Sequence, residues 1–144
     1  MLFSRLLSLF LAFTCCFWLT ACQPKTAPLE FAPDGEIVQK AIALALNQTQ
    51  ARLSEQLKTV APQLELDNVN VKKLEPIVVN ELPAYHLTGF YDVKLSLPRQ
   101  TVTQKKNPFE IYLQRQSEGK SWRLLKREAK PDQASQWSSY LITP

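Results

Sequence analysis

The chain is 144 residues long and has few of the residue types from which active sites are commonly built: one histidine, three cysteines and three glycines. The single histidine, His86, and the singly scattered carboxylates indicate neither a metal site nor a Ser-His-Asp triad. Three glycines leave no phosphate-cradling loop and no dinucleotide fingerprint. The sequence therefore predicts no catalytic residue, no metal and no cofactor, and we interpret His86 as a surface histidine.

All three cysteines lie near the N-terminus, at Cys15, Cys16 and Cys22. The chain after them contains no thiol, so its folded part depends on apolar packing without disulfides. A long hydrophobic run is lacking as well, because the uncharged stretch from Leu6 to Ala21 is shorter than the about 20 apolar residues of a spanning helix. With Arg5 before it and small residues at its end, this stretch is typical of a secretory signal.

The end of this stretch, Leu19-Thr20-Ala21-Cys22, resembles the lipobox of bacterial prolipoproteins: an aliphatic residue, two small residues and a cysteine. The resemblance implies that residues 1–21 are removed as a signal peptide and that the Cys22 thiol receives a diacylglyceryl group, with a further acyl chain on the new amine. Two or more acyl chains anchor a protein stably, whereas one binds only reversibly. We therefore expect an extracytoplasmic lipoprotein on the periplasmic face of the inner or the outer membrane.

Charge is unevenly distributed along the chain. Residues 30–92 contain five Lys or Arg and nine Asp or Glu, whereas residues 94–130 contain ten and three. Outside the cytoplasm, a basic region favours anionic lipid headgroups or an acidic protein partner over nucleic acid. The alternative is a solvated face that only keeps the protein soluble. The candidate docking patch consists of the basic residues around the last predicted hairpin: Lys105, Lys106, Arg115, Arg123, Lys126 and Arg127.

One long amphipathic helix is predicted after Pro33. Asp34 is a candidate N-cap, and Pro62 lies beyond the helix end. Apolar residues recur at steps of three and four, with Thr49 in series, which is the pattern of a single buried stripe. The stripe consists of Val38, Ile42, Leu46, Leu53, Leu57 and Val60. Because a helix cannot bury such a stripe alone, we expect a sheet against it.

Beyond Pro62 the hydrophobic period changes to two, which predicts strands. The first strand contains Pro76 and is expected at a sheet edge or broken there, because proline lacks a ladder donor. The clearest strand runs over residues 84–97, with Gly89 expected at a bulge or bend. Residues 100–107 are polar and are predicted to form a loop. A third strand is predicted to begin at Pro108.

A tight turn at residues 117–120 predicts that the third strand pairs with a fourth strand containing Trp122 and Leu124. The register about this turn pairs Leu113 with Leu124, and Tyr112 with Leu125. It also pairs Glu110 with Arg127, and places Arg115 opposite Trp122 within reach of a cation–π contact.

The sequence thus predicts an α+β fold in which one long N-terminal helix packs on a curled four-stranded antiparallel meander. This order of elements is similar to that of cystatin-like and NTF2-like folds, although the cystatin motif Gln-x-Val-x-Gly is absent. Residues 22–33 are predicted to be a lipid-anchored tether that lifts the domain by roughly 20–30 Å. Residues 34–130 form the domain, and residues 131–144 are a tail that either docks or is mobile.

Three functional hypotheses are compatible with these features. The first is a non-enzymatic membrane-anchored lipoprotein whose domain binds a protein or a membrane surface, for example as an accessory subunit of a membrane complex. The second is a carrier of a small apolar ligand or peptide between helix and sheet, which requires a cavity there. The third is an enzyme, which requires convergent polar groups inside such a cavity.

Overall fold

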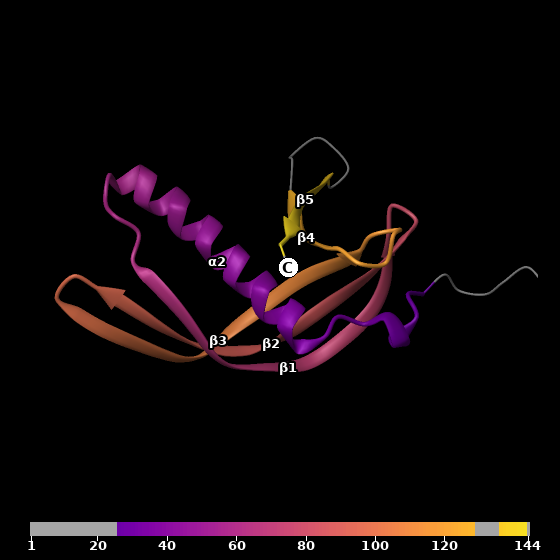
Figure 1. The fold of residues 1–144 in the computed structure, drawn as a ribbon, viewed down its shortest axis with the longest axis horizontal. Coiled ribbons are helices and arrows are strands. Elements are labelled where there is room, and N and C mark those ends of the chain that lie inside the picture. The colour runs from indigo at the N-terminus through magenta and orange to yellow at the C-terminus, as the bar shows by residue number, and fades with distance from the viewer. Residues whose placement is uncertain (1–25, 129–135, 144) are drawn as a thin grey trace, which may run out of the picture.

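The computed structural model describes residues 26–128 and 136–143 (Figure 1). The predicted signal peptide and Cys22 lie outside these residues. A short 3-10 helix, η2 (Leu29–Phe31), precedes the long helix α2 (Gly35–Leu57). The strands follow as β1 (Gln63–Val79), β2 (Leu82–Leu97), β3 (Gln100–Arg115), β4 (Trp122–Glu128) and β5 (Gln136–Ile142). Within the described residues, no helix is long and apolar enough to cross a membrane.

The strands form one antiparallel sheet in which spatial order follows chain order, from β1 to β5. The predicted α+β class is confirmed, but the predicted number of four strands is wrong. The fifth strand, β5, comes from the segment interpreted as a tail, and it pairs with β4 from Trp122↔Ile142 to Glu128↔Gln136. This strand is short and rich in serine, so its sequence carries a weak alternation signal. Its last residue, Ile142, nevertheless joins the main core.

The predicted loop at residues 100–107 is also wrong, because these residues form the first half of β3. A turn at Pro98 and Arg99 reverses the chain, and pairing with β2 begins at once with Leu97↔Gln100. This end of the hairpin is largely exposed on both faces, so it needs no apolar alternation, and Thr101, Val102 and Thr103 suit a strand. Pro76, in contrast, lies in the edge strand β1, as predicted.

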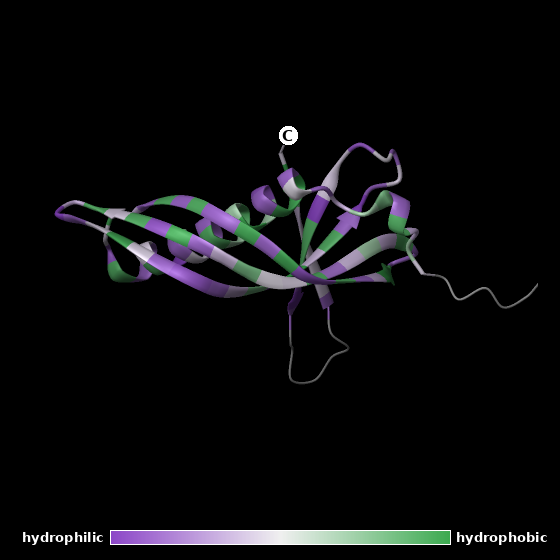
Figure 2. Cartoon of the chain, turned by 90° about the horizontal axis from the view of Figure 1, so that it is seen from below, coloured by the Kyte–Doolittle hydropathy of each residue, from purple (hydrophilic) through white to green (hydrophobic). Residues whose placement is uncertain are grey.

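The main core lies between the concave face of the sheet and the N-terminal half of α2. Hydrophobic and hydrophilic residues alternate along the strands (Figure 2), so each strand turns one set of side chains towards the helix. The helix begins at Asp34, whose carboxylate accepts the Ile37 N–H at 2.9 Å, as expected for an N-cap. The fully buried large side chains are Val38, Ile42, Tyr85, Leu87, Leu113 and Leu124.

The predicted apolar stripe of the helix is buried only in its first half. Exposed fractions rise along it, from 2% for Ile42 to 46% for Leu53 and 69% for Leu57. The last predicted position, Val60, is 93% exposed and lies beyond the end of the helix, which the sequence had placed too late. Figure 1 shows the reason, because α2 rises away from the strands towards its C-terminus. The second half of the stripe therefore contributes little to the core of this domain.

The three long strands bend together around the middle of β2. A Cβ atom on Gly89 would lie 2.1 Å from the Asn70 carbonyl oxygen, so only glycine permits this approach. The bulge predicted at Gly89 lies on the neighbouring strand, because the β1–β2 register shifts on either side of Asn70 and Val71. The β2–β3 register shifts at a similar level, between Tyr91 and Val93. Paired irregularities of this kind increase local twist and curl the sheet around the helix.

Asp92 connects the bulges on the two sides of β2. Its carboxylate accepts hydrogen bonds from the Asn68 amide at 2.9 Å and from the Lys106 backbone N–H at 2.7 Å. Both Asn68 and Lys106 have positive φ angles, 51° and 55°. The hydrogen bond from Asn68, followed by that from Lys106, holds the pKa of Asp92 below its usual value. One carboxylate thus stabilises two left-handed residues in two strands.

The uneven burial of the helix predicts different effects of two matched truncations. Ile42→Ala is expected to lower the free energy of unfolding by about 2–5 kcal/mol, because it leaves a cavity in the core. Leu53→Ala is expected to lower it by less than about 1 kcal/mol, because its side chain is half exposed. Urea unfolding at constant m-value measures both. Equal losses would show that α2 packs on the sheet along its whole length.

Candidate functional site

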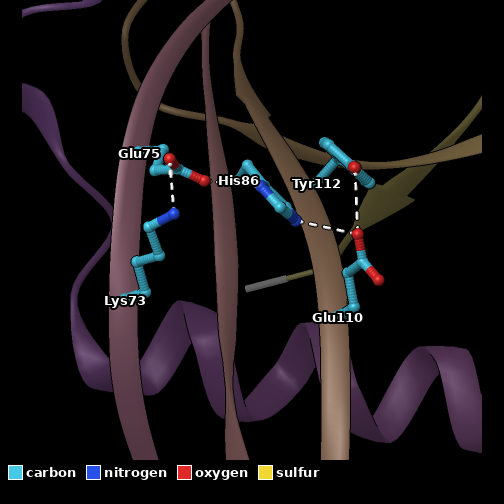
Figure 3. A network of polar contacts seen from close by, with 5 residues as sticks. All are labelled: Lys73, Glu75, His86, Glu110 and Tyr112. Carbon is cyan, nitrogen blue, oxygen red and sulfur yellow. Dashed lines mark hydrogen bonds and ion pairs between the residues drawn. The ribbon is translucent and has the colours of Figure 1, made fainter.

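The largest group of interacting polar side chains lies on the convex face of the sheet, on the side away from α2 (Figure 3). This polar cluster consists of Lys73 and Glu75 from β1, His86 from β2, and Glu110 and Tyr112 from β3. Register explains the assembly, because Glu75, His86 and Tyr112 are successive cross-strand partners. Directly opposed residues on one sheet face lie within contact distance.

His86 connects the three strands of the polar cluster. Its Nδ1 lies 3.1 Å from Glu75 Oε2, and its Nε2 lies 2.9 Å from Glu110 Oε1. The ring stacks on Tyr112 with centroids 4.4 Å apart and an interplanar angle of 7°. Tyr112 donates its hydroxyl to the same Glu110 oxygen at 3.1 Å. His86 therefore lies on the convex face of the sheet, but its side chain is only 20% exposed, which is less than expected for the surface histidine predicted from the sequence.

The carboxylates of the polar cluster face solvent, and Lys73 Nζ lies 2.7 Å from Glu75 Oε1. Hydrogen bonds from Lys73 and then from His86 lower the pKa of Glu75. The cluster lies on an open sheet face, so it can hold three strands in register but does not enclose a substrate. Within residues 26–128 and 136–143, no group of three His, Cys, Asp or Glu side chains is placed to hold a metal ion.

A second, smaller core covers the same face beside the polar cluster. Val79, Ala84 and Leu125 are buried there under the Tyr112 and Trp137 rings, whose centroids lie 5.1 Å apart. Trp137 belongs to β5, so the segment predicted as a tail closes this part of the convex face. Sequence reasoning missed the contact because residues 129–135 separate Trp137 from the rest of the sheet.

The six basic residues of the predicted docking patch occupy different parts of the sheet. Lys105 and Lys106 lie at the β3 bulge, where the backbone of Lys106 binds Asp92. Arg115 lies at the end of β3, and its guanidinium donates to the Gly119 carbonyl at 2.8 and 3.1 Å. The remaining three, Arg123, Lys126 and Arg127, lie on β4.

The predicted register about the last turn holds for its central pairs. Leu113↔Leu124, Tyr112↔Leu125 and Arg115↔Trp122 are partners, as predicted. The β3–β4 ladder ends at Tyr112 and does not extend to Glu110, and the Glu110 carboxylate contacts His86 and Tyr112. The guanidinium of Arg115 lies over Phe31, 4.5 Å from the ring centroid, in place of the predicted contact with Trp122.

The basic residues of β4 contact different neighbours. Arg123 donates to the Ser139 hydroxyl at 3.0 Å. Lys126 Nζ lies 5.3 Å from the Tyr140 ring centroid, and burial, together with the nearby charge of Arg52, lowers the pKa of Lys126. Lys126 therefore lies on the surface beside α2, whereas Lys105 and Lys106 lie at the bulge of β3, where the sheet bends.

The described part of the predicted tether, from about Ala27 onwards, contacts the sheet. Ala27 is buried, and the Pro28 carbonyl accepts a hydrogen bond from the hydroxyl of the fully buried Tyr85. Burial raises the pKa of Tyr85. With Phe31 under Arg115, these contacts make the chain from about Ala27 onwards part of the domain.

Grooves and exposed apolar residues lie elsewhere on the surface. A groove of about 340 Å³ between α2 and β1 is lined in part by Leu46, Leu64 and Leu66. A second, of about 550 Å³, surrounds the half-exposed Phe90 on the convex face. Four exposed apolar residues lie near the ends of α2 and β2, and we call this group the distal apolar surface: Leu53, Leu57, Val60 and Leu97.

Searches of protein-family models, curated proteins and solved structures give no match for this chain. The geometry of the described residues is therefore the basis for a functional assignment.

The polar cluster predicts a pH-dependent contribution to stability. The folded-state pKa of Glu75 is lowered, so its contribution is present above the unfolded-state pKa and is lost as pH falls through the folded-state pKa. Glu75→Gln is therefore expected to lower the urea midpoint at about pH 7 and to leave it unchanged at about pH 3. Glu55→Gln, on the exposed end of α2, is the control. A Glu75→Gln effect of equal size at both pH values would contradict the assignment.

Proposed function

We propose that this chain is a membrane-anchored lipoprotein of the bacterial envelope whose α+β domain binds another envelope protein. The observation that carries the proposal is the distal apolar surface, together with the lipobox-like residues that end at Cys22. Leu57 and Val60 are 69% and 93% exposed, and several large apolar side chains exposed at one end of a domain suggest a contact that covers them. The four residues of this surface include half of the helix stripe, which the sheet of this domain leaves uncovered.

Charge around the distal apolar surface favours an acidic partner. Arg52 and Lys58 lie on or directly after the exposed end of α2, and Arg99 lies in the turn after β2. Of the nearby carboxylates, Glu65 is paired with Lys94 at 3.2 Å, and Glu55 lies on the opposite side of α2 from Leu57. An apolar centre with a cationic rim fits a partner that presents an apolar contact surrounded by carboxylates. Such a partner is compatible with a role as an accessory subunit of a membrane complex.

The groove between α2 and β1 favours a second candidate function, that of a carrier for an apolar ligand. Leucine side chains from both elements line it, and its volume of about 340 Å³ lies within the range of small-molecule sites. The groove is open to solvent and also lined by Glu36, Gln39 and Lys40, which suits a protein contact at least as well. An enzymatic role has no comparable support, because the polar cluster lies outside both grooves.

The anchor can be tested on the native product. Mass spectrometry is expected to find residues 1–21 absent and Cys22 carrying a diacylglyceryl group and a further acyl chain. A matched variant, in which a cleavable secretory signal without cysteine replaces residues 1–22, is expected to leave the membrane fraction. An intact leader with a free Cys22 thiol, or membrane retention of this variant in high salt, would contradict lipid anchoring.

The distal apolar surface can be tested by photo-crosslinking in cells. A photoreactive phenylalanine at Leu57 is expected to capture a specific envelope protein, because this position belongs to the exposed stripe. The same residue at Glu55, on the opposite side of the helix, is the control. Affinity for the captured protein in purified form is expected to fall at least about tenfold in Leu57→Asp. Capture of lipid in place of protein would contradict the proposed protein contact.

A further inference from the structure

The end of the molecule opposite the distal apolar surface contains a short helix and two turns between strands. Figure 1 shows η2, the β1–β2 turn and the β3–β4 turn together at this end, which we call the anchor end. The Pro28 carbonyl is bound by Tyr85, and Phe31 lies under Arg115, so η2 is fixed to the sheet at two points. Two residues of η2 remain outside the core, with exposed fractions of 65% for Leu29 and 42% for Phe31.

Chain length places the anchor end close to Cys22. Ala27 is already buried in the domain, so five peptide units separate it from Cys22. At no more than about 3.6 Å per residue, they span less than about 20 Å. A lipid-bearing Cys22 at the headgroups would therefore hold η2 within the reach of the interfacial region, which is several ångströms thick on each side of the hydrocarbon core.

The chemistry of the anchor end suits a bilayer interface better than an anionic surface. Leu29 and Phe31 are exposed on a short helix, and Phe31 remains 42% exposed although the Arg115 guanidinium lies over its ring. The charges nearby are mixed: Arg115 and Lys120 are offset by Glu30, Glu81 and Glu118. Contact with lipid would then depend on apolar insertion and would be insensitive to salt.

We infer that the anchor end lies against the bilayer and that η2 inserts Leu29 and Phe31 into the headgroup region, an inference that rests on the proposed lipidation of Cys22. In this orientation the anchor end of the domain contacts the membrane. The strand β2 runs from the anchor end to the distal end over 16 residues, a contour of about 53 Å at 3.3 Å per residue. The distal apolar surface is thereby presented away from the lipid, to a partner that extends tens of ångströms from the bilayer.

Depth-dependent quenching tests this orientation. The lipidated protein has no free thiol, so Glu30→Cys introduces one label site on η2, and Arg99→Cys introduces one in the β2–β3 turn as the control. Each variant is labelled with an environment-sensitive fluorophore and reconstituted into phosphatidylethanolamine–phosphatidylglycerol vesicles that contain a lipid with a nitroxide near its headgroup. The label at residue 30 is expected to lose most of its fluorescence, and the label at residue 99 to keep it.

A second comparison separates insertion from mere proximity. Adding Leu29→Ser and Phe31→Ser to Glu30→Cys is expected to reduce the quenching, whereas adding Leu57→Ser at the distal end leaves it unchanged. Quenching is also expected to persist in molar salt. Equally weak quenching at residues 30 and 99, in protein that floats with the vesicles and carries lipid on Cys22, would overturn the orientation alone. Protein without lipid on Cys22 would overturn both the anchor and the inference.

Discussion

A bend across the three long strands determines where this domain buries its apolar residues. At Gly89 the neighbouring carbonyl of Asn70 occupies the space of a Cβ atom, and at Asp92 one carboxylate holds left-handed residues in both adjacent strands. Gly89 and Asp92 belong to the central one of these three strands, so the irregularities in β1 and β3 are coupled through β2. A straight helix can follow only one half of a sheet bent in this way. Helix α2 begins at the bend, where it packs on the core that contains Tyr85 and Leu113, and it rises away from the distal half of the sheet towards its C-terminus.

The convex face is held by a different kind of interaction. His86 contacts the carboxylate of Glu75 on β1 and that of Glu110 on β3, and its ring stacks on Tyr112. These contacts connect the three strands across the convex face without a layer of apolar side chains. Exposed ion pairs of this type contribute little individually, since water screens them. Their geometric effect is larger, because register determines which residues of β1, β2 and β3 face the helix. Close by, Trp137 of β5 adds the apolar cover that the polar cluster lacks.

Local patterns predicted the elements better than they predicted burial. The N-cap at Asp34, the edge position of Pro76 and the pairing of Leu113 with Leu124 follow from short-range rules, and the structure has all three. The exposure of Leu57 depends on the angle between the helix and the bent sheet. The spacing of apolar residues along the helix carries no information about that angle. The position of Arg115 over Phe31 joins residues 84 positions apart, so the spacing around the turn could suggest only Trp122 as its aromatic partner. The basic residues of the predicted patch were close in sequence, but strand direction and face separated them.

The arrangement of the two ends imposes a constraint on where an apolar contact can lie. Proteins anchored in one bilayer meet each other at high effective concentration, so an apolar surface on the side of such a domain would promote lateral self-association. An apolar surface at the tip, with Arg52, Lys58 and Arg99 around it, repels an identical tip through like charge and still admits a partner with carboxylates. If the chain is anchored as proposed, Leu57 and Val60 can therefore remain exposed without causing lateral self-association. Partner choice would then depend on charge, whereas the affinity of the contact would depend on the leucines.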